Sequence, residues 1–212
     1  MKQILVIIFT IFSTIISAQE NTDFLMEGNN LLNQNKPKDA ELIFKKGIEK
    51  NPNDLILKNQ LALSQINQKE NLKAQETLNE ILESDSLNVA SLWYSGINNY
   101  TQKPAKMDEA IKYFEKVYPL LNKNSGQFFG VNYFIGNSYK TLLYTKGLSY
   151  DEVSRMLETL KIYTDLQPEA DDYKSTKEFI TKIEQNRAPK NVKKWIITTQ
   201  ENAEKVLQEN MK

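Results

Sequence analysis

The chain has 212 residues, with 27 basic and 27 acidic side chains, and it contains neither His nor Cys. The length allows one or two domains, and the balanced charge disfavours a nucleic-acid-binding module, which usually carries a basic excess. The two missing residue types remove the commonest general base, the usual zinc ligands, thiol catalysis and disulfide bonds. We therefore expect no nucleic-acid partner, no catalytic activity, no metal and no cofactor.

Residues 1–18 have the pattern of a secretory signal peptide. Lys2 precedes an apolar run from Ile4 to Ile16, and two small residues end at Ala18 before a glutamine. The apolar run is too short for a transmembrane helix. The Ala-Gln junction resembles that of secreted proteins of Bacteroidetes-type bacteria. We predict cleavage after Ala18 and an exported protein, periplasmic or secreted, with no membrane span after cleavage. An uncleaved anchor or a buried helix is the alternative.

From Phe24 to Pro52 the sequence predicts two short amphipathic helices, and their pattern returns 34 residues later. Three positions recur at this interval: Gly28 as Ala62, Ala40 as Ala74, and Phe44 as Leu78. Helices pack closely only where the side chains at their crossing are small. We therefore expect Gly28 and Ala40 at a crossing, with Phe44 filling the space beside it. A constant period of this length is typical of stacked helical hairpins that bury their apolar faces against their neighbours.

This pattern of small residues, large apolar residues and a closing Pro resembles the tetratricopeptide repeat (TPR). The resemblance implies an all-α fold, a right-handed superhelix of stacked antiparallel helix pairs that forms a TPR-like α-solenoid. Three positions depart from the pattern, and one of them is Lys58, which stands where Phe24 stood. Asn59 stands where a bulky apolar residue is expected, and Ser86 replaces the closing Pro of the second repeat.

Residues 19–212 are predicted to form one repeat domain. We place four repeats at about 21–54, 55–88, 89–124 and 126–168, following the 34-residue period of stacked arrays. Local signals set the turns: Pro37 suits the first turn of a helix, Asp54 can cap one, and Gly147 can end one. Capping helices with one polar side are expected over residues 171–210, as Asp171–Arg187 and Asn191–Asn210.

In TPR arrays the first helix of each pair lines a concave groove that holds a peptide or a segment of another protein. Carried onto this sequence, the resemblance implies a groove lined by Asn29, Asn33, Asn59, Leu63, Asn67, Trp93, Ile97, Tyr100, Tyr133, Asn137 and Lys140. Asn side chains both donate and accept hydrogen bonds, and Trp and Tyr are frequent binding anchors. In the alternative interpretation, the aromatic residues pack between repeats and the Asn residues are only solvated.

Three acidic pairs could carry acid–base chemistry or bind a divalent cation. They are Asp108-Glu109, Asp151-Glu152 and Asp171-Asp172. Each pair opens a predicted helix, where negative charge complements the helix dipole. We therefore interpret them as structural.

These observations predict a non-catalytic scaffold or adaptor of the cell envelope that binds another protein or peptide. Two alternatives stay open. A carbohydrate-processing accessory or enzyme would use Trp93, Tyr94 and Tyr133 to stack on sugar rings. A self-assembling structural scaffold would associate through the final helix, with Trp195 and Ile196 exposed.

Overall fold

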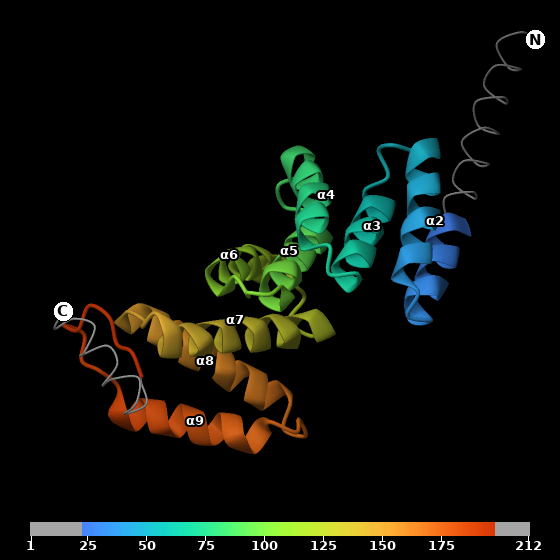
Figure 1. Ribbon diagram of the computed structural model, residues 1–212. Helices are drawn as coiled ribbons and strands as arrows, with labels where there is room; N and C mark the ends of the chain where they lie inside the picture. The colour runs from blue at the N-terminus through green and yellow to red at the C-terminus, as the bar shows by residue number, and fades with distance from the viewer. Residues whose placement is uncertain (1–22, 198–212) are drawn as a thin grey trace, which may run out of the picture. The chain divides into compact units, whose positions relative to one another are not determined.

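The computed structural model describes residues 23–197, and it is helical there apart from turns, short connections and one isolated β-bridge (Figure 1). Residues 23–33 form the first described helix. It is followed by α2 (Pro37–Lys50), α3 (Leu55–Asn67), α4 (Asn71–Ser84), α5 (Val89–Thr101), α6 (Met107–Val117), the 3₁₀ helix η1 (Tyr118–Leu120), α7 (Gly126–Thr145), α8 (Tyr150–Leu166) and α9 (Tyr173–Asn186). The predicted all-α class is confirmed. The predicted signal peptide lies outside the described residues.

The chain divides into two compact units, residues 1–98 and 99–212. We call them the N-terminal unit and the C-terminal unit. In the N-terminal unit α3 packs against both α2 and α4. In the C-terminal unit α7 packs against α6 and α8, and α9 packs against α8. Among residues 23–197, no helix combines the length and apolar character needed to cross a membrane.

The helix ends follow local sequence signals. Pro37 occupies the first turn of α2, where its missing N–H costs no hydrogen bond. The Asp54 carboxylate accepts from the backbone N–H groups of Ile56 and Leu57, at 2.9 and 3.0 Å, and caps α3. Gly147 has φ of +73°, and it follows the last turn of α7. All three turn predictions are confirmed.

Small residues lie where helices meet in the N-terminal unit. A Cβ atom added to Gly28 would lie 2.1 Å from Cε1 of Phe44, so the ring occupies the space that the glycine leaves open. Ala40 is 0% exposed and belongs to one apolar cluster with Phe44, Leu57 and Leu61. Gly28 and Ala40 therefore lie in the helix–helix contact that the repeat pattern predicted.

In the C-terminal unit, too, small residues lie where helices meet, around a larger core cluster. A Cβ atom on Gly136 in α7 would lie 2.5 Å from Cδ2 of Leu160 in α8. Ala110 in α6 is 0% exposed. The core cluster of this unit contains Ile111, Leu142, Leu143, Leu148, Val153, Met156, Leu157, Leu160, Ile180 and Ile183.

The prediction of a second capping helix is wrong over its described part. The first capping helix exists as α9, but residues 191–197 are not helical. Trp195 instead pairs with Leu148, with backbone N–O distances of 2.7 and 2.8 Å. The Ile197 N–H donates to the carbonyl of Leu143 at 3.1 Å. These backbone groups find partners on the last turns of α7 and on the α7–α8 connection, which removes their need for helical partners. Residues 198–212 lie outside the described residues.

Candidate binding surfaces

The residues predicted to line a groove belong to two units, and each set is described within its own unit. The N-terminal unit holds Asn29, Asn33, Asn59, Leu63, Asn67, Trp93 and Ile97. The C-terminal unit holds Tyr100, Tyr133, Asn137 and Lys140.

Three of these positions form a row in the N-terminal unit. Asn29, Leu63 and Ile97 recur at 34-residue intervals on the first helices of three successive repeats, and each is partly exposed. One turn further along their helices, Asn33 and Asn67 are exposed. Stacked repeats present equivalent positions on the same side. We call this set the first-helix face; it comprises Asn29, Asn33, Leu63, Asn67, Trp93 and Ile97.

Asn59 does not belong to this face, which corrects the prediction. It is only 4% exposed. Its amide nitrogen donates to the carbonyl of Leu55 at 2.8 Å, and its amide oxygen accepts from the Ser91 hydroxyl at 2.8 Å. A buried amide needs such partners, and Ser91 lies on α5. Asn59 therefore joins α3 to α5.

Other side-chain amides continue this connection to α5. The Asn98 side chain donates to the carbonyl of Asn71 at 2.9 Å and to the Gln75 side chain at 3.2 Å, both on α4. The Tyr94 hydroxyl is hydrogen-bonded to the Gln60 side chain of α3, and burial raises its pKa above the ordinary value. Hydrogen bonds from Tyr94 and Asn98 therefore hold α5, the first helix of the third repeat, against α3 and α4.

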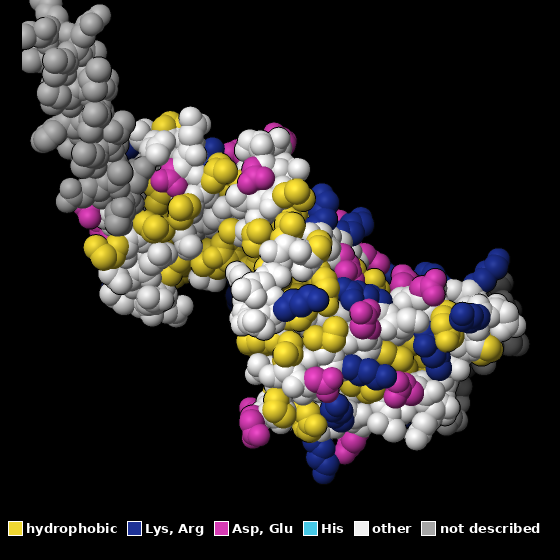
Figure 2. All heavy atoms as spheres, turned by 180° about the vertical axis from the view of Figure 1, so that it is seen from behind, with side chains coloured by type: hydrophobic (Ala, Val, Ile, Leu, Met, Phe, Trp, Pro, Cys, Tyr) yellow, Lys and Arg dark blue, Asp and Glu magenta, His cyan; other side chains and the backbone are white. Residues whose placement is uncertain are grey.

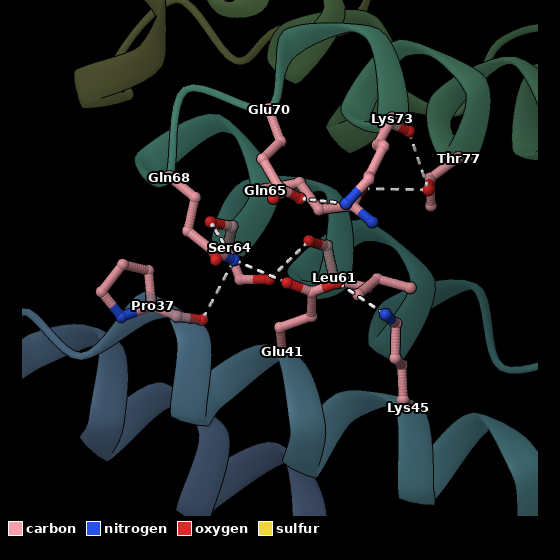
Figure 3. Close-up of polar contacts among 10 residues, drawn as sticks. All are labelled: Pro37, Glu41, Lys45, Leu61, Ser64, Gln65, Gln68, Glu70, Lys73 and Thr77. Atoms are coloured by element: carbon pink, nitrogen blue, oxygen red, sulfur yellow. Dashed lines mark hydrogen bonds and ion pairs between the residues drawn. The ribbon is translucent and has the colours of Figure 1, made fainter.

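A buried carboxylate on α2 forms a polar cluster with α3 that sequence reasoning missed (Figure 3). Glu41 is 8% exposed; it accepts from Nε2 of Gln68 at 2.7 Å and pairs with Nζ of Lys45 at 2.6 Å. Burial alone would raise the pKa of Glu41, but the hydrogen bonds from Lys45 and Gln68 outweigh it and lower the pKa below 4.5. The cluster fastens the first repeat to the second. Its only sequence signal is the i,i+4 spacing of Glu41 and Lys45.

The two predicted aromatic residues of the C-terminal unit are packed in part against other rings. Tyr100 and Tyr133 contact Phe134 edge-on, with ring centroids 5.0 and 5.4 Å away, and Tyr133 also contacts Tyr163 at 5.1 Å. Burial and a hydrogen bond with Tyr133 raise the pKa of Tyr100 to about 12. The Tyr163 hydroxyl donates to Asp172 at 2.7 Å. Both predicted residues therefore have structural contacts, and both remain partly exposed.

Asn137 and Lys140 also lie on α7 and are partly exposed. The Asn137 amide donates to the carbonyl of Tyr133 one turn earlier, at 3.1 Å. The Lys140 ammonium lies 4.6 Å from the centroid of the Phe179 ring on α9. This cation–π contact places Lys140 between α7 and α9.

Two of the three acidic pairs lie in the first turn of a helix, as the structural interpretation predicted, whereas the third, Asp171-Asp172, ends at the residue before α9. Asp108 and Glu109 occupy the first turn of α6, and Asp151 and Glu152 occupy that of α8. Glu152 completes a capping box with Ser149. Within residues 23–197, no group of three or more His, Cys, Asp or Glu side chains is placed to hold a metal ion.

Comparison with solved structures identifies the fold. The MamA RS-1 ArsTM double mutant is similar over 78% of this chain and 93% of that chain, with a TM-score of 0.58 and 17% sequence identity. MamA is a TPR protein, so the fold of this chain is that of a TPR-like helical repeat. No protein-family model matches the sequence, and no curated protein matches it.

Proposed function

We propose that this chain is a non-catalytic scaffold of the cell envelope that binds another polypeptide through the first-helix face of its N-terminal unit. The observation that carries the proposal is the row of Asn29, Leu63 and Ile97. Equivalent positions of three repeats stay partly exposed there, within a fold similar to that of a TPR protein.

The chemistry of this face suits a peptide segment. Leu63, Trp93 and Ile97 offer partly exposed apolar surface, and Asn33 and Asn67 offer donors and acceptors at its exposed edge. Figure 2 shows apolar side chains gathered over the N-terminal unit, whereas charged side chains are interspersed over the C-terminal unit. Large exposed apolar residues on the first helices include Met26 and Ile56, which are 59% and 61% exposed.

Site-specific photo-crosslinking tests the proposal. A photoreactive phenylalanine analogue replaces Leu63 in one variant and Ile97 in a second, and the protein is irradiated in an envelope extract. We expect the same polypeptide to be crosslinked at both positions, because they belong to one row.

The control places the same analogue at Glu76 or Glu80, which are exposed on the second helix of the repeat. We expect no crosslinked product at these control positions. We also expect the product of the Leu63 and Ile97 variants to be lost when Trp93→Ala is added to them. Equal products at all positions would show non-specific contact and would overturn the proposal.

The envelope location is supported by the signal-peptide pattern of residues 1–18, with its apolar run and small-residue junction. An exported scaffold of this kind would meet its partner outside the cytoplasm.

A further inference from the structure

The segment that follows α9 is held firmly against the rest of the C-terminal unit although it is not helical. We call residues 187–197 the C-terminal strap. Trp195 exchanges two backbone hydrogen bonds with Leu148 and packs against the core cluster. At the other end of the strap, the Arg187 guanidinium donates to the carbonyl of Tyr150 and to the Ser154 hydroxyl. The strap therefore presents its outer side in a defined arrangement.

The strap is strongly basic. It contains Arg187, Lys190, Lys193 and Lys194 and no acidic residue. The three lysines are exposed, and within residues 23–197 none of them forms an ion pair. Two cations lie over the ring of Tyr150: the Arg187 guanidinium is 3.5 Å from its centroid, and the Lys190 ammonium is 5.3 Å from it. Cations gathered in this way attract an anionic partner.

The strap also has backbone N–H and C=O groups that could pair with an added strand. Trp195 directs its N–H group toward Leu148 in the α7–α8 connection, and Ile197 directs its own toward Leu143 near the end of α7. Because alternate residues of an extended chain point their backbone groups to opposite sides, Lys194 and Ile196 direct theirs away from these partners. These groups have no backbone partner within the described part of the chain. The Ile196 side chain is 48% exposed beside them.

We propose that the C-terminal strap binds an extended, acidic segment of another polypeptide. The segment adds as a strand along Lys194 and Ile196, and its carboxylates meet the strap lysines. Strand addition to an exposed edge supplies main-chain hydrogen bonds, and the charges set which segments bind. An anionic membrane would satisfy the cations but not the backbone groups, so the edge favours a polypeptide. This surface belongs to the C-terminal unit, whereas the first-helix face belongs to the N-terminal unit.

The test uses the full chain and a fluorescein-labelled heptapeptide of alternating Glu and Val, with a Lys-Val peptide as its counterpart. We expect saturable binding of the acidic peptide only, measured by fluorescence anisotropy. The variant Lys190→Gln, Lys193→Gln, Lys194→Gln is expected to weaken binding by about tenfold or more, the equivalent of ~1.4 kcal/mol. The matched control changes Lys116, Lys123 and Lys174 to Gln, because these lysines are also exposed. It removes the same net charge and should change affinity by less than about twofold.

The variant Ile196→Pro tests the strand edge, since Pro removes the N–H at this position and leaves those of Trp195 and Ile197. We expect it to weaken peptide binding while circular dichroism and the melting temperature stay unchanged. Equal losses in the two lysine variants would overturn the proposal. So would binding to vesicles containing anionic lipid without binding to the peptide, or peptide binding that occurs only after residues 198–212 are removed.

Discussion

The ring of Phe44 occupies the space where a side chain on Gly28 would begin: a Cβ atom on Gly28 would lie 2.1 Å from Cε1 of Phe44. Phe44 is fully buried in a cluster with Ala40, Leu57 and Leu61, so its ring would have to shift within the core. We expect Gly28→Ala to lower the free energy of unfolding by about 1–3 kcal/mol, the usual cost of overpacking a core. Urea denaturation followed by circular dichroism measures it.

Gly126→Ala is the matched control. Its added Cβ atom would lie 3.4 Å from the Phe129 ring, which is an ordinary contact. Because Ala favours helix more than Gly does, we expect unchanged or slightly higher stability. A Gly28→Ala variant as stable as the wild type would show that the first two helices do not pack as described.

Lys69 adopts a left-handed backbone conformation with φ of +64° in the turn between α3 and α4. This conformation is strained for a residue with a Cβ atom and free of strain for glycine. We expect Lys69→Gly to raise the free energy of unfolding by about 1 kcal/mol, because relief of the strain outweighs the greater conformational freedom that glycine loses on folding. Urea denaturation measures it. Lys69→Ala keeps the strain and should give no gain. Asn35, at the equivalent position one repeat earlier, has φ of +56°.

Glu41 makes the stability of the N-terminal unit decrease at acid pH. Its pKa is lowered in the folded state, so the carboxylate stabilises the fold above pH ~4.5, and this contribution is lost as the pH falls through the folded-state pKa. We expect Glu41→Gln to cost about 1–2 kcal/mol at pH 7 and less at pH 3, measured by denaturation at each pH. Glu80→Gln, at an exposed position of α4, is the control. A constant difference between wild type and Glu41→Gln would contradict the cluster.

Tyr100 contributes stability that is lost as the pH rises, whereas the contribution of Glu41 is lost as the pH falls. Burial and the hydrogen bond with Tyr133 raise its pKa to about 12. A raised pKa stabilises the fold below the unfolded-state value of about 10, and this contribution disappears as the pH rises toward 12. We expect the free energy of unfolding of Tyr100→Phe to fall less steeply over this range, as followed by urea denaturation. Tyr144→Phe is the control, since Tyr144 is 48% exposed.

Export can be tested through the N-terminus of the protein. When the full chain is produced in a bacterium, we expect the form recovered from the envelope or the medium to begin at Gln19, because small residues precede it. Intact-mass measurement gives the first residue. The variant Ala18→Arg should block cleavage, whereas the control Thr22→Ser, beyond the junction, should not. An uncut chain in the cytoplasm would contradict export.

The sequence alone determined the helical repeat. The 34-residue interval between Gly28 and Ala62 indicates equivalent helix crossings, and Pro37, Asp54 and Gly147 end or begin helices through interactions within a few residues. Such signals are local, so they can be read without knowing the fold.

The tertiary structure decided which side chains are exposed and which are hydrogen-bonded to residues distant in the sequence. Asn59 was predicted to line a groove, but its partner Ser91 is 32 residues away. Glu41 pairs with Gln68, 27 residues away. The segment around Trp195 has helical periodicity, yet its backbone bonds to Leu148 instead. A periodic pattern records the face that a residue occupies, whereas the choice between solvent and a distant partner depends on the packing of whole repeats.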